Sequence, residues 1–503
     1  MILLKDFTCE YYTRKSVDDL PPYFEYELTT MPTSLFSDCG LRKTNKSTLA
    51  KELRKTLEGA VQFQMPAGQL HHVIDGGCLL HRVVWLTTGT YIDIVQQYMN
   101  YVRKHYGYRC SVVFDGYCGG PSVKDAEHQR RAKKECPDID VEQHNPVYGN
   151  QAAFLMNANN KQAFVNLLAQ HLQAQNYTVY HAKDDADTLI ARVTMDLAGK
   201  RDSTIVVVTD DTDVLVLLLY HFREEMSDII MMSEMARKRT ARKALSPIRE
   251  IRNNVGQRAV NQLLVIHAIS GCDSTSAMYG HGKVGVFKNI TKHRDSEILT
   301  SIIESGSSSH AQVVEAGLRL MTLLYGGKPE SDTLNSLRYE GYMSQLSSCK
   351  NQPRPERLPP TEDAAKYHIM RVHIQVVQWK YLMDIELDAK EWGWKDVNGV
   401  LQPIATELRA APDDLLNIIS CKCKMMRSHP CSSMICTCYK HGLSCVTACK
   451  HCCGKACNNV LINSSTSYPE SLEDSEAEEL RIDGLHDEAD IEIYEEIVET
   501  EMD

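Results

Sequence analysis

Seven aspartates of this 503-residue chain stand where chemistry could be done, because nearly all of them follow apolar segments. Asp273 differs, since it follows a helical segment that breaks at Gly271. The full set is Asp75, Asp115, Asp185, Asp187, Asp211, Asp213 and Asp273. Carboxylates gathered in one place could bind hard divalent cations such as Mg²⁺.

The segments around these acids predict how they are positioned. Short β-rich segments at 70–75, 110–115, 176–182 and 203–210 alternate with helical patterns at 151–175, 186–197 and 213–220. Alternating strands and helices predict an α/β fold with a parallel sheet. The carboxyl ends of parallel strands share one edge, where ligands bind. We therefore expect the acids to line one cleft.

So many carboxylates in one cleft repel one another unless cations are bound. Mg²⁺ or Mn²⁺ suits an all-carboxylate site better than zinc. About two ions, roughly 4 Å apart, would hold a phosphodiester between an attacking water and the leaving oxygen. The alternative for each single Asp is that it caps the next helix. Capping alone does not require the pairs Asp185/Asp187 and Asp211/Asp213, which follow two different strands.

Residues 70–295 resemble the PIN-like, flap-endonuclease (XPG-type) nuclease superfamily. The motifs that carry the resemblance are VIDGG, VVFDG, Asp185-Ala186-Asp187, Thr209–Asp213, Ser270–Asp273 and Tyr279–Lys283. The resemblance implies that the seven aspartates are catalytic and bind two Mg²⁺ or Mn²⁺ ions. It also implies that Arg130 and Arg131, in a basic segment ending at Lys134, bind phosphate. Lys283 either binds phosphate or is solvated.

Ten of the 18 cysteines lie between residues 421 and 457. A long chain without an export signal is not a disulfide framework, so thiolates holding zinc are expected. Nine thiolates can hold about three zinc ions if three of them bridge. The candidates are Cys421, Cys423, Cys431, Cys436, Cys438, Cys445, Cys449, Cys452, Cys453 and Cys457, with Cys452 or Cys453 the spare thiol.

The spacing of these cysteines resembles the tesmin-type CXC domain, one half of a CRC module. That resemblance implies a DNA-binding zinc cluster with basic residues near it, and this chain has Lys422, Lys424 and Lys450 there. The alternative is a small zinc-stabilised domain that binds another protein.

Charge is distributed unevenly along the chain. Residues 469–503 carry 16 Asp/Glu and one Arg, a balance of −15, whereas the other residues carry 54 Lys/Arg and 50 Asp/Glu, a balance of +4. Such a tail is expected to be disordered and is a possible site for a protein partner. The sequence shows no apolar run of the roughly 20 residues that span a bilayer and no secretory signal, so a membrane partner is not expected.

The expected organisation is an N-terminal region (1–65), a PIN/FEN-like nuclease domain (66–330), a mostly helical connecting region (331–420), a zinc cluster (421–459) and an acidic tail (460–503). Within the first region, a helix from Ser47 capped by Ser or Thr is expected. The basic stretch 237–252 is expected to be a solvated loop or helix face, or else an arm that contacts phosphate.

Three functions fit this pattern. The first is a divalent-metal-dependent nuclease that the zinc cluster delivers to nucleic acid, with DNA the expected kind. The second is a catalytically inert DNA-binding protein of chromatin or mobile-element origin, and the third is a zinc-dependent scaffold. The intact acid set favours the first, because an idle site would be expected to lose some of these costly charges. A nuclear location is expected, with the cytoplasm as the alternative.

Overall fold

The computed structural model divides the chain into two compact units, Met1–Ile418 and Ile419–Asp503. The finer borders expected at 65/66 and 330/331 stay predictions. The structure describes residues 20–29, 31–37, 40–57, 65–86, 88–116, 123, 136–183, 186–234, 243–347, 353–382, 385, 387–412, 421–424, 431–440, 445, 449–452 and 457–459. Asp185, Arg130, Arg131, Cys453 and the acidic tail lie outside the described residues.

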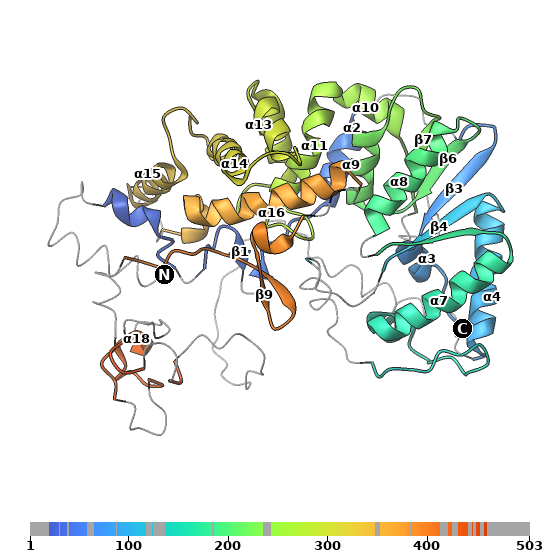
Figure 1. Cartoon of the computed structure of the whole chain (residues 1–503), viewed down its shortest axis with the longest axis horizontal. Helices are drawn as coiled ribbons and strands as arrows, with labels where there is room; N and C mark the ends of the chain where they lie inside the picture. The colour runs from blue at the N-terminus through green and yellow to red at the C-terminus, as the bar shows by residue number, and fades with distance from the viewer. Residues whose placement is uncertain are drawn as a thin grey trace, which may run out of the picture. The chain divides into compact units, whose positions relative to one another are not determined.

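The first unit has an α/β fold built on a mostly parallel central sheet, as expected (Figure 1). Among the described residues, its six strands lie in the order β5-β4-β3-β6-β7-β8. The first five are parallel, and β8 pairs antiparallel with β7 at the edge. The strands are β3 (Leu70–Asp75), β4 (Cys110–Phe114), β5 (Thr178–His181), β6 (Thr204–Val208), β7 (Ile229–Glu234) and β8 (Lys243–Pro247).

Alternate residues of the central strands face two separate apolar cores. On β6, Ile205 and Val207 pack with α8 and α9, whereas Val206 and Val208 pack with α4 and α7. Helices therefore cover both faces, which is why the strands are almost continuously apolar. These helices are α3 (Gly76–Arg82), α4 (Tyr91–Tyr106), α6 (Gln151–Met156), α7 (Ala158–Ala174), α8 (Ala186–Gly199) and α9 (Thr212–His221).

The strand order reverses at β3, because the chain adds β4 and β5 on one side and β6 and β7 on the other. In an open parallel sheet, such a switch point opens a crevice at the carboxyl ends of the strands. The crevice here lies beyond the ends of β3, β4 and β6. Asp75, Asp115 and Asp211 stand at those three ends.

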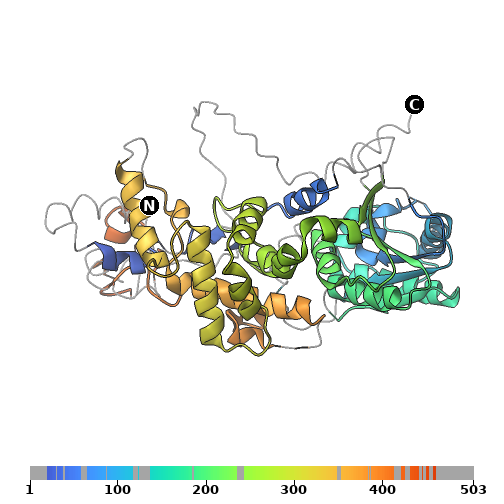
Figure 2. The ribbon, with the colours of Figure 1, turned by 90° about the horizontal axis from the view of Figure 1, so that it is seen from above.

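A helical extension continues from the sheet, as expected (Figure 2, light green through yellow to orange). Its elements are α10 (Ile248–Val255), α11 (Gln257–Ile269), α12 (Lys283–Lys292), α13 (Ser296–Ile303), α14 (His310–Leu324), α15 (Leu334–Ser347), η3 (Pro355–Arg357), α16 (Glu362–Lys380), η4 (Ala389–Glu391) and the hairpin of β9 (Trp394–Val397) and β10 (Val400–Pro403). The second unit contains α18 (Thr437–Lys440) among its described residues.

The N-terminal region is part of the first unit. Its elements are η2 (Pro21–Glu25), the two-residue strands β1 (Phe36–Ser37) and β2 (Gly40–Leu41), and α2 (Ser47–Lys55). The buried pair of Glu27 and Arg338, 3.2 Å apart, ties its start to α15. Helix α2 packs against α9, α10 and α12 and lies beside the green helices in both views (Figures 1 and 2).

The structure answers three local expectations, two of which were wrong. The single helix over 151–175 is two helices, because the Asn157 side chain caps α7 by accepting hydrogen bonds from the backbone of Asn159 and Asn160. The described part of the basic stretch is a strand from Lys243 followed by α10, so residues 248–252 lie on a helix, one of the forms expected, and only the strand was not expected. The helix from Ser47 exists, but Ser47 does not cap it. Instead Asn45 Oδ1 accepts from the Ser47 amide at 3.0 Å, and Lys46 is the N-cap residue.

Candidate metal centres

Two of the aspartates do cap helices, as the alternative interpretation proposed, but capping occupies only part of each carboxylate. Asp75 Oδ1 accepts the amide of Cys78 at 3.1 Å, and Asp211 Oδ1 accepts the amide of Asp213 at 2.7 Å. Each carboxylate has lone pairs left over. The caps therefore fix the orientation of these groups and leave oxygens for a cation.

Asp75 and Asp115 flank Gly77, the second residue of α3. A Cβ at Gly77 would lie 3.2 Å from Asp75 Oδ1 and 3.4 Å from Asp115 Oδ2. A side chain at this position would therefore fill the space between the two carboxylates. Asp115 Oδ1 also accepts the amide of Ala186 at 3.1 Å, which ties the end of β4 to the start of α8.

A second acidic group lies at the starts of α8 and α9. Asp187, Asp211 and Asp213 each offer one carboxylate oxygen, and these three oxygens all lie within 4.8 Å of one another. Asp187 and Asp213 are only 7% and 2% exposed. Three carboxylates this close and this dry are the donor set that a hard divalent cation prefers.

Hydrogen bonds link the two acidic groups. The Thr209 hydroxyl donates to Asp75 Oδ2 at 2.8 Å, and the amide of Asp211 donates back to the Thr209 hydroxyl at 3.2 Å. Thr209 is fully buried, so this bridge is held by the end of β6. Thr209 lies in the Thr209–Asp213 motif, but its residue type alone does not indicate this bridging role.

Burial and like charge act on these carboxylates in the same direction. Burial and, next, the Asp115 charge raise the pKa of Asp75 to about 6. Burial and the Asp213 charge raise the pKa of Asp211 to about 7. With its pKa near 7, the Asp211 carboxyl is about half-protonated at neutral pH, because burial and a like charge both disfavour its charged form.

Asp213 is held on one side by a buried chain of polar groups. His267 Nε2 lies 2.7 Å from Asp213 Oδ1, and Lys283 Nζ lies 3.0 Å from His267 Nδ1. Burial and then the Lys283 charge lower the pKa of His267 to about 4. The imidazole is therefore neutral at pH 7, with Nε2 donating to Asp213 and Nδ1 accepting from Lys283.

The phosphate contact expected of Lys283 does not fit this position. The side chain is fully buried, and its ammonium also donates to the His267 carbonyl at 2.9 Å and to the Ser270 hydroxyl at 3.2 Å. Burial lowers the pKa of Lys283 to about 7. Lys283 begins α12 and its Nζ points inward, so it supports His267 rather than a ligand in solution.

Asp273 joins the site through a residue that the sequence analysis missed. Lys46 Nζ lies 3.0 Å from Asp213 Oδ2 and 2.7 Å from Asp273 Oδ1. Burial by itself lowers the pKa of Lys46, but the surrounding carboxylates, led by Asp213, outweigh it and hold the pKa well above its ordinary value. No local pattern marks Lys46, which lies 167 residues before Asp213 in the chain.

The structure thus brings six of the seven candidate acids into one network: Asp75, Asp115, Asp187, Asp211, Asp213 and Asp273. The seventh, Asp185, and the candidate phosphate ligands Arg130 and Arg131 are outside the described residues. Asp210, beside the network in sequence, is half exposed and pairs with Arg82 at 3.0 Å.

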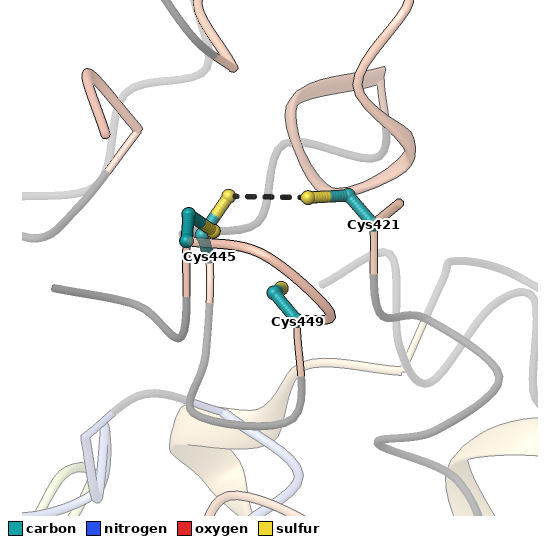
Figure 3. A group of neighbouring side chains, drawn as sticks. Cys421, Cys445 and Cys449 are labelled. Atoms are coloured by element: carbon teal, nitrogen blue, oxygen red, sulfur yellow. Dashed lines mark hydrogen bonds between the residues drawn. The ribbon is translucent and has the colours of Figure 1, made fainter. Parts of the chain in front are cut away.

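The second unit holds a cluster of thiols. All nine described cysteines between 421 and 457 belong to groups of four whose sulfurs lie within 4.8 Å of one another. Cys421 and Cys445 each belong to three of these groups, and Figure 3 shows their sulfurs facing each other. Overlapping groups require bridging sulfurs if each group holds its own ion, and Cys421 and Cys445 are placed to bridge.

The spacing of the sulfurs also fits zinc. Sulfur–sulfur distances are 3.7 Å for Cys421–Cys431, 3.9 Å for Cys421–Cys445 and 3.5 Å for Cys438–Cys449. Four thiolates about 2.3 Å from a tetrahedral zinc are about 3.8 Å apart. Burial raises the pKa of the Cys421 and Cys445 thiols, so a bound metal would have to displace their protons.

Comparison of the sequence with family models finds no match, and comparison with curated proteins finds no relative. Comparison of the structure finds flap endonucleases, the type of nuclease that the motifs resemble. The bacteriophage T5 D15 flap endonuclease, in a complex with DNA and metal ions, is 13% identical and has a TM-score of 0.31, over 61% of this chain and 99% of that chain.

The catalytic core of Rad2 in complex with DNA substrate is found in two further structures. One is 14% identical with a TM-score of 0.33, over 64% of this chain and 80% of that chain. The other is 15% identical with a TM-score of 0.28, over 45% of this chain and 62% of that chain.

The raised pKa of Asp211 predicts how pH changes stability. Its pKa is about 7 in the folded protein and 3.8 ordinarily. Between these values the folded state holds a proton that the unfolded chain has lost, so this group lowers stability as pH rises from about 4 to about 7. Asp211→Asn cannot titrate, so without added Mg²⁺ it should gain at least about 1 kcal/mol over wild type across that window. Denaturant unfolding at several pH values measures this, and a pH-independent difference would contradict it.

The thiol cluster predicts a metal count. Full-length protein purified with zinc should contain about three zinc ions per chain by elemental analysis, because overlapping groups of four share sulfurs. A strong chelator should unfold the second unit and leave the first folded, since metal binding supplies the folding free energy of so small a unit. Limited proteolysis followed by mass spectrometry would show which unit opens. A count near one would refute the shared-sulfur arrangement.

Proposed function

We propose that this protein is a divalent-metal-dependent nuclease that hydrolyses phosphodiester bonds. The observation that carries the proposal is the convergence of Asp187, Asp211 and Asp213 within 4.8 Å, beside a second carboxylate pair around Gly77. A site with two such groups can hold two cations at the end of a parallel sheet, where the backbone of a nucleic acid can approach.

The residues present fit hard cations. Every candidate ligand is a carboxylate oxygen, and the space between Asp75 and Asp115 is kept open by a glycine. Mg²⁺ or Mn²⁺ bound there would polarise the phosphate and make a water molecule more acidic. Zinc fits less well, because His267, a histidine that contacts the network, turns its Nε2 to Asp213 as a donor.

The chain's own residues do the positioning. Asp75 and Asp211 are oriented by helix amides and by Thr209, Asp115 by the start of α8, and Asp213 by His267. Ligands held in this way change little when a cation binds, and pre-organisation of this kind is what makes electrostatic catalysis effective. The fixed carboxylates also give the site a strong negative field, so it would bind phosphates only after cations have entered.

The zinc cluster is proposed to deliver the nuclease to DNA. Lys422, Lys424 and Lys450 are exposed on the described part of the second unit, and basic residues of this kind bind the phosphate backbone. Exposed apolar side chains lie on the same unit, with Ile435 71% and Met434 66% exposed. These support a binding surface for a macromolecule, and the nuclear location is proposed together with the DNA partner.

The nuclease proposal is tested with purified protein and labelled single-stranded, duplex and flap DNA and RNA, each with Mg²⁺, with Mn²⁺ and with a chelator. Cleavage that requires the divalent ion is expected. Binding of DNA without cleavage of any substrate would favour the inert DNA-binding alternative, and neither binding nor cleavage would favour the scaffold.

A matched pair of variants assigns any activity to this site. Asp187→Asn removes one charged ligand at nearly constant shape, so it should lower the cleavage rate by about a hundredfold or more. Asp196→Asn, on the exposed side of the same helix α8, removes the same charge and should keep the wild-type rate. Equal rates in the two variants, at equal folded fraction, would mean that the acidic cluster does not do the chemistry.

A further inference from the structure

Lys46 reaches the acidic network from a region that precedes the sheet in the chain. Its ammonium lies between two carboxylates, 3.0 Å from Asp213 Oδ2 and 2.7 Å from Asp273 Oδ1. Asp213 Oδ1, the other oxygen of that carboxylate, already accepts from His267. In this structure both oxygens of Asp213 therefore face nitrogen donors.

The position of Lys46 follows from packing of the N-terminal region. The segment before it pairs with the loop that carries Asp273: the amide of Ala277 donates to the Arg42 carbonyl at 2.7 Å, and the amide of Tyr279 to the Ser34 carbonyl at 2.9 Å. The Lys43 ammonium also donates to the Asp273 carbonyl at 3.0 Å. Asp273 and the residues that follow it are thus held next to the segment that precedes α2.

The other end of α2 is anchored as well. Arg54 Nε donates to the Ser246 hydroxyl of β8 at 2.7 Å, and a second nitrogen of Arg54 lies 3.3 Å from the Ser233 hydroxyl of β7. With both ends of the helix fixed, the backbone of Lys46, the residue just before α2, is held beside the acidic network.

Charge explains what an ammonium does there. The six described carboxylates can carry six negative charges, and two divalent ions supply four positive charges. Before those ions bind, the Lys46 ammonium supplies one positive charge close to Asp213 and Asp273. Without any cation, two carboxylates facing the same small space would repel one another strongly.

We propose that Lys46 is a positioning residue of the candidate nuclease site, whose ammonium occupies one cation position between Asp213 and Asp273, so that a divalent ion binding to those two carboxylates must displace it. The inference rests on the proposed function. The side chain is 22% exposed, and the rotatable lysine stem lets the ammonium swing towards solvent while α2 stays in place. Before a divalent ion binds, the Lys46 ammonium offsets the repulsion between Asp213 and Asp273 and holds both carboxylates in place.

Direct measurement of Mn²⁺ binding tests this without any need for activity. Zinc-loaded full-length protein is titrated with Mn²⁺, and free Mn²⁺ is followed by electron paramagnetic resonance. Lys46→Met should bind Mn²⁺ at least about tenfold more tightly than wild type, because it removes both a competitor and a like charge. Lys46→Arg, which keeps the charge, should stay within about threefold of wild type.

Lys51→Met is the matched control, because Lys51 is an exposed lysine on the same helix. Its loss should change Mn²⁺ affinity by less than about twofold, since water and salt screen an exposed charge. Without Mn²⁺, Lys46→Met should also melt at a lower temperature than Lys51→Met, and saturating Mn²⁺ should close that gap.

Equal Mn²⁺ affinity in Lys46→Met and Lys51→Met would overturn the inference, and so would weaker binding in Lys46→Met, which would mean that the ion needs the ammonium. Asp211→Asn in the same titration separates this failure from failure of the nuclease proposal. If wild type binds Mn²⁺ and Asp211→Asn does not, the site is real whatever Lys46 does. Absence of any binding that depends on Asp211 would defeat both.

Discussion

Repulsion among carboxylates that share one dry end of a sheet is the constraint on which the rest of the first unit depends. Each of these charges would be cheaper in water, and a folded protein can hold them together only by supplying positive partners or protons. The structure supplies partners for these carboxylates from several parts of the fold. Amides at helix starts, a buried threonine, a neutral histidine and a lysine from the N-terminal region each contact at least one of the acids.

The parts of the fold each position either the acids or the groups that contact them. The parallel sheet places strand ends at one edge, and the helical extension supplies α11 and α12, which carry His267 and Lys283. The N-terminal region lies across both and brings Lys46. At Gly271 the backbone has a φ of +102°, and a Cβ there would lie 2.8 Å from the Ala277 amide, so the turn that presents Asp273 requires glycine.

Much of this arrangement could be predicted from the sequence, because strand ends are a local feature. The four apolar segments became β3, β4, β5 and β6, and the acids after them met where the parallel strands end. Contacts between distant segments could not be predicted. Lys46 meets Asp213 across 167 residues, and the exposure expected of Lys283 ignored that its helix starts inside the core. The break at Asn157 was missed for another reason, since a single side-chain cap outweighed a continuous helical pattern.

The most direct test of the account is a crystal structure of the full-length protein grown with Mn²⁺, with anomalous scattering used to locate the ion. The account predicts a strong Mn²⁺ peak within ligand distance of Asp187, Asp211 and Asp213. Ordered density for these carboxylates at saturating Mn²⁺, with no anomalous peak among them, would contradict the claim that the cluster is a divalent-metal site.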